Sequence, residues 1–219
     1  MNNVAQNIIK LEEETPMMQQ YITIKKEHPD SILFFRMGDF YEMFNEDAKI
    51  ASRVLEIALT SRNKNKANPT PMCGIPHHSS KSYIAKLIKS GKKVAICEQT
   101  EDPKFTKGLV KREVVRVVTP GTILDDNLLD PKQNHFLVSL YSNAKGWGFA
   151  ALDITTGLFK VTEFYGDDRE LLLKDEIEKF DPKEIILSEN LVTGCNKPKW
   201  LEDRESSLQS CEDWTFSFK

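Results

Sequence analysis

The sequence contains no apolar run that approaches the ~20 residues needed to cross a bilayer. Its first 14 residues also lack the basic start and the apolar stretch of a secretory signal peptide. We therefore expect a cytoplasmic protein that has no membrane partner.

Cysteine is scarce, with four residues at positions 73, 97, 195 and 211 and no C-x-x-C pair. This spacing does not resemble the dense disulfide framework of small secreted domains, so we expect reduced thiols. Cys73, His77 and His78 lie close together in the sequence, but a structural zinc site needs four ligands and no convincing fourth is present. We expect no metal site.

The common enzyme motifs are absent. There is no G-x-x-x-x-G-K-[ST] phosphate loop, no G-x-G-x-x-G, no H-E-x-x-H and no G-x-S-x-G. One catalytic alternative stays open, a metal-dependent nuclease whose strand-borne carboxylates Asp153 and Glu163 hold divalent ions. Because one central carboxylate does not make a two-metal site, we interpret Asp153 as a residue that stabilises the Thr155–Gly157 turn.

Charge is unevenly distributed along the chain. Residues 61–120 carry 13 Lys and Arg against 4 Asp and Glu, whereas the residues on both sides carry an excess of acid. A basic segment between acidic ones is typical of a surface that faces a polyanion. The alternative is a set of solvated lysines on helix faces, which we favour for Lys81, Lys86, Lys89, Lys92 and Lys93.

Residues 15–125 have the alternating helices and strands of a small α/β domain. Thr15-Pro16 is a typical helix start, and His28-Pro29 disfavours continuation beyond Glu27. The patterns predict helices over 16–27, 41–55 and 81–90, strands over 32–35, 56–61, 94–97 and 114–118, and an exposed loop over 62–71. We expect residues 1–14 to be disordered.

Residues 126–134 are polar and contain a proline, which suits a linker. Strands are predicted over 135–141, 147–154 and 158–165, followed by a helix over 168–180 and a strand over 184–187. The short turns between the first three strands require antiparallel neighbours. The order β-β-β-α-β is the opening of a ribonuclease H-like sheet, so we expect residues 135–219 to form an incomplete domain of this kind.

The segment Phe34–Phe44 places three aromatic residues within five positions after a glycine turn. One interpretation is that Phe40 and Phe44, four residues apart, pack together under a helix. The other is that Phe40 is an exposed wedge of the kind that minor-groove binders insert between base steps. Glu42 is either a first-turn helix acid favoured by the helix dipole or a hydrogen-bond partner of a base edge.

Several motifs, in this order and spacing, resemble the bacterial MutS mismatch-repair family. They are TPMMQQY (15–21), FRMGDFYE (35–42), GIPHH (74–78), VAICEQ (94–99), VVRVVTPGT (114–122) and LDITTG (152–157). The resemblance covers about residues 15–190. His77 departs from it, since an aromatic residue such as tyrosine is expected at this position.

The resemblance implies a mismatch-binding domain followed by the start of a connector domain. It makes Phe40 the stacking wedge and Glu42 the hydrogen-bond partner of the displaced base in mismatched double-stranded DNA. It also places Arg62 and Arg112 near the DNA backbone, and charge alone adds Lys64, Lys66 and Lys107.

The resemblance further implies a clamp and an ATPase domain beyond residue 219, so we expect this chain to be a fragment. ATP and Mg²⁺ belong to that missing ATPase domain, and we expect no cofactor and no enzymatic activity in the chain itself. The longer protein is expected to form a homodimer, to associate with the nucleoid and to bind a MutL-type protein through its connector domain. A docking platform in the acidic second domain is compatible with mismatch binding.

Overall fold

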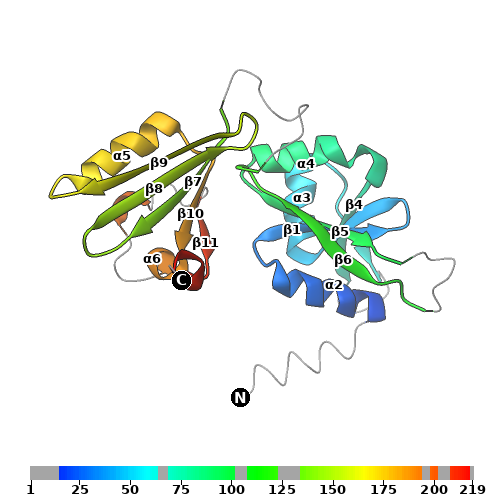
Figure 1. Ribbon diagram of the computed structural model, residues 1–219. Coiled ribbons are helices and arrows are strands. Elements are labelled where there is room, and N and C mark those ends of the chain that lie inside the picture. The colour runs from blue at the N-terminus through cyan, green and yellow to red at the C-terminus, as the bar shows by residue number, and fades with distance from the viewer. Residues whose placement is uncertain are drawn as a thin grey trace, which may run out of the picture. The chain divides into compact units, whose positions relative to one another are not determined.

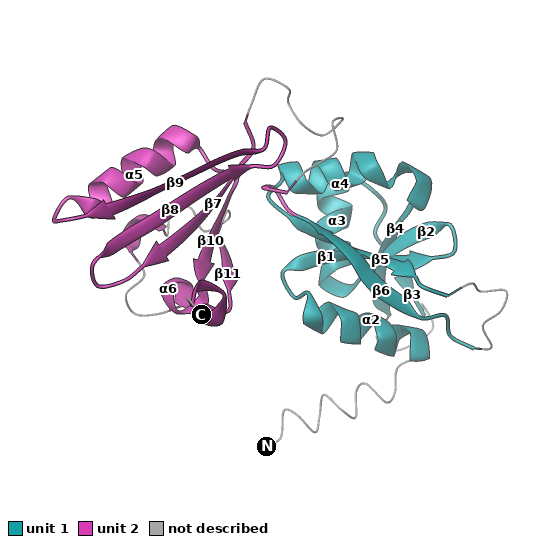
Figure 2. Cartoon of the chain, viewed as in Figure 1, with its two compact units in different colours: residues 1–118 teal, residues 119–219 magenta. Residues whose placement is uncertain are grey.

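The computed structural model describes residues 15–63, 69–101, 108–122, 134–193, 198–201 and 208–217 (Figure 1). The chain divides into two compact units, residues 1–118 and 119–219 (Figure 2). The predicted disordered start over 1–14 and nearly all of the predicted linker over 126–134 lie outside the described residues. No helix among the described residues is long and apolar enough to span a membrane.

The first unit is built on a six-stranded sheet with the order β3-β4-β2-β1-β5-β6. β1 and β5 are parallel neighbours, and every other neighbouring pair is antiparallel. The strands are β1 (Ser31–Met37), β2 (Phe40–Phe44), β3 (Thr60–Arg62), β4 (Thr70–Pro76), β5 (Lys93–Gln99) and β6 (Arg112–Val118). The sheet therefore has β3 and β6 at its edges.

Helices cover both faces of this sheet, with α2 (Pro16–Glu27) on one side and α3 (Asn45–Leu55) and α4 (Ser80–Lys89) on the other (Figure 1). On the α2 side, Met18 and Tyr21 pack with Leu33, Phe35 and Phe44 in one buried cluster. The start of α2 follows the prediction, because the Thr15 hydroxyl accepts a hydrogen bond from the Met18 amide at 3.4 Å.

The predicted helix over 41–55 is wrong in its first four residues, which belong to strand β2. Apolar residues at 40, 41, 43 and 44 fit a helix and a strand equally well, and pairing with β1 and β4 decides for the strand. β3 begins at Thr60, so residues 56–59 are not the predicted strand. The predicted exposed loop over 62–71 is wrong at its two ends, because Arg62 belongs to β3 and residues 70–71 begin β4. The rest of β4 was not predicted as a strand.

The second unit has a five-stranded sheet with the order β11-β10-β7-β8-β9. β7 (Phe136–Ser142), β8 (Gly146–Asp153) and β9 (Leu158–Tyr165) are antiparallel, and β10 (Glu184–Ser188) runs parallel to β7 and to β11 (Leu208–Cys211). α5 (Arg169–Phe180) connects β9 to β10, and the short α6 spans Glu189–Thr193. This order confirms the predicted ribonuclease H-like arrangement, and β11 adds a fifth strand in a segment without a recognised motif.

Candidate nucleic-acid interface

Phe40 is presented by a tight hairpin between β1 and β2. Gly38 and Asp39 form the two-residue turn, and Gly38 has φ +57°, a conformation that a glycine adopts without strain. Phe40 is the first residue of β2, and its neighbours across the strands are Met37 and Pro76. Phe40 is 49% exposed.

The extended backbone of β2 separates Phe40 and Phe44, which one interpretation of the sequence packed together under a helix. In a strand, Phe40, Glu42 and Phe44 point to the same face of the sheet. Phe44 is fully buried there, with its ring 4.9 Å from the ring of Tyr21. The interpretation of Phe40 and Phe44 as a packed pair under a helix is therefore wrong.

Glu42 lies on the same face as Phe40, two residues further along β2. Its side chain is 20% exposed, and its Oε2 is 3.3 Å from Nη1 of Arg62. Burial raises the pKa of the Glu42 carboxyl, while the positive charges of Arg62 and Arg112 act in the opposite direction. Because Glu42 lies in a strand, its interpretation as a first-turn helix acid is wrong.

Arg62 is the last residue of the edge strand β3, and its side chain is 37% exposed. In this structure its described partner is Glu42. Lys64, Lys66 and Lys107, which were predicted as further contacts with the DNA backbone, lie outside the described residues. Arg62 is therefore the predicted basic residue that the structure brings beside the Phe40–Glu42 pair.

The expectation that Arg112 faces the DNA backbone is corrected by its burial. The residue is 7% exposed, and its guanidinium donates to the carbonyl oxygens of Arg36 and Val110 at 2.7 and 2.9 Å and to Oε1 of Gln20 at 3.1 Å. With four contacts inside the domain and little exposed surface, this side chain is not positioned to meet a phosphate. The sequence showed an arginine in a basic segment but not that it is buried.

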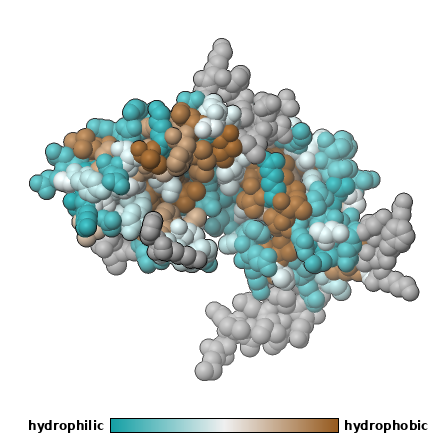
Figure 3. All heavy atoms as spheres, in the orientation of Figure 1, coloured by the Kyte–Doolittle hydropathy of each residue, from teal (hydrophilic) through white to brown (hydrophobic). Residues whose placement is uncertain are grey.

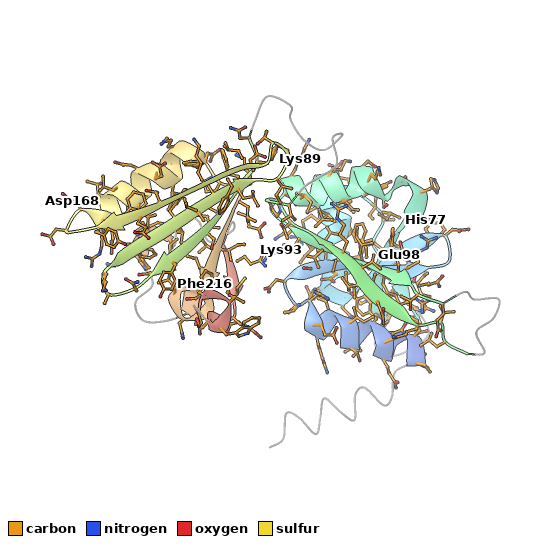
Figure 4. All side chains as sticks on the ribbon, viewed as in Figure 1. His77, Lys89, Lys93, Glu98, Asp168 and Phe216 are labelled. Atoms are coloured by element: carbon orange, nitrogen blue, oxygen red, sulfur yellow. The ribbon has the colours of Figure 1, made fainter. Side chains whose placement is uncertain are left out.

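The opposite face of the hairpin carries a second polar group that the sequence analysis did not single out. Tyr41 donates a hydrogen bond to Glu98 of β5, and Arg36 lies 3.6 Å from the same carboxylate. Burial, together with the hydrogen bond to Glu98, raises the pKa of Tyr41 to about 12. Figure 4 shows Glu98 on the sheet of the first unit, where it links β5 to the hairpin. Strand alternation could have pointed to Tyr41. Because it lies between Phe40 and Glu42 in β2, its side chain points to the opposite face of the sheet.

Cys73, His77 and His78 make separate contacts in the structure. Cys73 is fully buried, and its thiol contacts the Ala48 carbonyl oxygen at 3.5 Å, while burial raises its pKa to about 11. His77, labelled in Figure 4, lies just beyond β4, with its Nδ1 3.2 Å from the Asp39 carbonyl oxygen. Across the described ranges, no group of three or more His, Cys, Asp or Glu side chains is arranged to hold a metal ion.

The carboxylates of the nuclease alternative are also separated. Asp153 is fully buried, and its Oδ1 accepts hydrogen bonds from the amide and the hydroxyl of Thr155 at 2.9 and 2.6 Å. Glu163 pairs across the sheet with Gly148, five residues from Asp153 along β8, and therefore points to the other face. Asp153 thus stabilises the turn after β8, and the two carboxylates have no common site.

Comparison with known proteins agrees with the division into two units. A family model described as MutS domain I matches residues 15–127, and one described as MutS domain II matches residues 135–218. The chain is similar to proteins named DNA mismatch repair protein MutS from three bacteria. Identity is 56% over 178 residues for Desulforamulus reducens, 54% over 177 for Staphylococcus aureus and 48% over 210 for Alkaliphilus oremlandii.

These alignments cover 81%, 81% and 92% of this chain and 20%, 20% and 23% of the respective relatives. The chain thus spans about a fifth of the length of the curated relatives that it matches. Since the domain I model alone covers more than half of the sequence and the domain II model follows it in order, the chain belongs to the MutS family.

Proposed function

We propose that this chain recognises base–base mismatches and small insertion or deletion loops in duplex DNA through Phe40 and Glu42. The observation that supports the proposal is the arrangement on β2. A half-exposed aromatic residue and a partly buried carboxylate share one face of a strand, directly after a tight turn.

Phe40 is suited to act as a wedge because its backbone is fixed on both sides. Its strand pairs with β1 and β4, so the ring is carried by the sheet and loses little freedom when it is inserted. Insertion of an apolar side chain unstacks a base step at a cost of a few kcal/mol. A mismatched step opens more cheaply than a paired one, and this difference gives selectivity without a sequence code.

Glu42 distinguishes a displaced base from a paired one. A carboxylate is repelled by phosphates, so its presence beside the wedge lowers the affinity for every duplex. A base that has left its pair offers a free donor or acceptor to this group, and the hydrogen bond offsets the repulsion. Arg62, with Lys64, Lys66 and Lys107 as further candidates, supplies phosphate contacts that hold the duplex without reading its sequence.

We assign the remaining roles to a longer protein, because the aligned part of this chain covers only 20% of such a relative. We propose that ATP and Mg²⁺ bind outside these two units, that the longer protein is a homodimer, and that its second unit docks a MutL-type protein. This chain itself carries recognition and no catalysis. The protein then acts in the cytoplasm, on the DNA of the nucleoid.

The test compares Phe40→Ala with the parent chain, using labelled duplexes that differ in a single mismatch and fluorescence anisotropy as the measurement. Exposure of an apolar side chain does not by itself single out Phe40, since Figure 3 shows apolar groups on the visible surface of both units. Phe159 of β9, which is 63% exposed, provides the matched control. We expect Phe40→Ala to reduce the preference for the mismatch at least tenfold and Phe159→Ala to preserve it.

Binding to the matched duplex is the second readout. Because Phe40 carries no charge, its removal leaves the weak, salt-sensitive binding to paired DNA in place. An equal preference for mismatched DNA in the parent and in Phe40→Ala, or an equal loss in Phe159→Ala, would be incompatible with the proposed wedge.

A further inference from the structure

Arg112 is a buried arginine whose contacts converge on the hairpin that carries Phe40. Its Nε donates to the Arg36 carbonyl oxygen at 2.7 Å, and its Nη2 lies 3.5 Å from the sulfur of Met37. Arg36 and Met37 are the last two residues of β1, and Met37 is the cross-strand partner of Phe40. The guanidinium therefore holds the strand end from which the turn begins.

Two further contacts fix the guanidinium itself. Its Nη1 donates to Oε1 of Gln20 in α2 at 3.1 Å and to the Val110 carbonyl oxygen at 2.9 Å. One side chain thus joins β6, α2 and the end of β1. A planar guanidinium with several fixed donors makes this junction, which a lysine ammonium cannot reproduce with the same geometry.

The same guanidinium also lies on the side of the sheet that Glu42 faces. It stacks over the ring of Phe35, with its central carbon 4.9 Å from the ring centroid. Phe35 and Glu42 are directly opposed across β1 and β2, and opposed residues of an antiparallel pair point to the same face. Arg112 is therefore the buried positive charge on the Glu42 side, whereas Arg62 is the exposed one.

We infer that Arg112 is a positioning residue for mismatch recognition: it fixes the end of β1 that presents Phe40 and supplies buried positive charge to the face that carries Glu42. The inference rests on the proposed function of Phe40 and Glu42. Arg112 acts through these two residues and makes no contact with DNA.

Electrostatics support this assignment. The charged groups that act on Glu42 are Arg62 from β3 and Arg112 from β6, and both lower the pKa of the carboxyl against the larger effect of burial. Arg62 is accessible to solvent and to phosphates, so a bound duplex competes for it. Arg112 is held by four contacts inside the unit, so its charge stays in place when DNA binds.

Three variants of the whole chain separate positioning from ordinary structural support. Arg112→Met removes the charge and the donors but keeps an apolar stem. Arg112→Lys keeps the charge and loses the fixed donors. Leu87→Ala creates a cavity in the core under α4, on the other face of the sheet, and serves as a control for lost stability because Leu87 is fully buried there.

The first measurement needs no DNA. The carboxyl carbon of Glu42 is followed by NMR while the pH is changed. We expect its pKa to rise in Arg112→Met, because an opposing buried charge is lost. The pKa should stay near the parent value in Arg112→Lys and Leu87→Ala. An unchanged Glu42 titration in Arg112→Met would overturn the electrostatic part of the inference.

The second measurement is the ratio of dissociation constants for matched and mismatched duplexes. We expect this ratio to fall about tenfold in Arg112→Met and by a smaller factor in Arg112→Lys, and to remain at the parent value in Leu87→Ala at a temperature where all variants are folded. A similar fall in Leu87→Ala would mean that Arg112 only stabilises the domain, and would overturn the inference.

The outcomes also distinguish this inference from the proposed function. If the parent and Phe40→Ala do not differ in mismatch preference, the wedge proposal fails and the inference fails with it. If Phe40→Ala loses the preference but both Arg112 variants keep it, the inference alone fails. If Arg112→Met does not fold, the Arg112→Lys variant provides the test. An unchanged Glu42 titration together with a lower ratio of matched to mismatched dissociation constants supports a positioning role. An unchanged ratio overturns the inference.

Discussion

Glu42 is a carboxylate beside a surface that is proposed to receive phosphates, and its protonation state therefore affects binding. Burial raises its pKa, so the carboxyl takes up a proton at a higher pH than an exposed glutamate does. The neutral form is not repelled by DNA, and it gains an O–H that donates to a base. Both effects increase the affinity for DNA as the pH falls.

We expect the affinity for mismatched DNA to increase as the pH falls through the pKa of Glu42, and Glu42→Gln to remove this dependence. The amide is neutral at every pH, so its affinity for matched duplex should exceed that of the parent at pH 7 by about tenfold, equivalent to ~1.4 kcal/mol of removed repulsion. Anisotropy titrations over a pH range that begins below the usual pKa of a glutamate carboxyl measure both effects. A pH profile that is the same for parent and Glu42→Gln would assign the dependence to another group.

Residues differ in how far the sequence could assign them. The roles of Phe40 and Glu42 stay predictions that the family resemblance implies, and the structure places both residues on one face of one strand. Arg112 was misassigned because its burial depends on α2 and β1, which are distant in the sequence. Charge is visible in a sequence, whereas the burial of that charge is a property of the fold.

At the scale of elements, the β1–β2 hairpin depends on one glycine. Gly38 has φ +57°, and a Cβ added there would meet nothing within 4 Å, so a substitution is penalised by backbone conformation alone. We expect Gly38→Ala to lower the free energy of unfolding by about 1–2 kcal/mol. Urea-induced unfolding measures this change.

Gly148 of β8 is the matched control for that experiment. A Cβ added at Gly148 would lie 3.7 Å from the Tyr141 side chain, in ordinary contact, and its φ is not positive. Gly148→Ala should therefore leave stability near the parent value. Equal stability of Gly38→Ala and the parent would mean that the turn tolerates a side chain and that the left-handed conformation of residue 38 carries no penalty.

The turn after β8 gives a second prediction at this scale. Burial acts to raise the pKa of Asp153, but hydrogen bonds from Thr155 and Thr156 prevail and lower it. A carboxyl with a lowered pKa stabilises the fold above its unfolded-state pKa, and this stabilisation is lost as the pH falls through the folded-state pKa. Asp153 should therefore contribute to acid unfolding below about pH 4.

We expect Asp153→Ala to destabilise the chain by about 1–3 kcal/mol at pH 7, because the Thr155 amide loses its acceptor. The exposed Asp167→Ala is the control and should have little effect. Urea-induced unfolding measures the free energy of unfolding of each variant. Incubation with branched DNA and Mg²⁺ tests the nuclease alternative. Mg²⁺-dependent cleavage by the parent that Asp153→Ala abolishes would show that this carboxylate is catalytic.

Element prediction succeeded where one periodicity dominated. The three antiparallel strands of the second unit and the start of α2 follow from alternation, short turns and a capping threonine. The helix prediction failed over residues 41–44 because the apolar residues there fit both the helical and the strand period. Only the pairing with β1 and β4 excludes the helix. That pairing is non-local, so a pattern within one segment does not contain it.

At the scale of the whole molecule, net charge conceals the distribution that matters for a polyanion. The chain has a formal net charge of −3, yet residues 61–120 carry a large excess of Lys and Arg. In the first unit, Lys86, Lys89 and Lys92 are exposed and Lys93 is partly exposed, around the end of α4 and the start of β5. Whether these lysines are a solvated helix face or part of a phosphate-binding surface is decided by the salt dependence of binding.

Counterion release makes the logarithm of the binding constant fall linearly with the logarithm of salt concentration, with a slope of about −0.9 for each phosphate neutralised. We expect Arg62→Gln to reduce the magnitude of this slope by about one and Phe40→Ala to leave it unchanged, because only the former removes a cation. The paired variant Lys89→Gln and Lys92→Gln should give the parent slope if these lysines are only solvated. Anisotropy at four salt concentrations measures the slopes, and a reduced slope in the lysine variant would extend the DNA-binding surface to the end of α4.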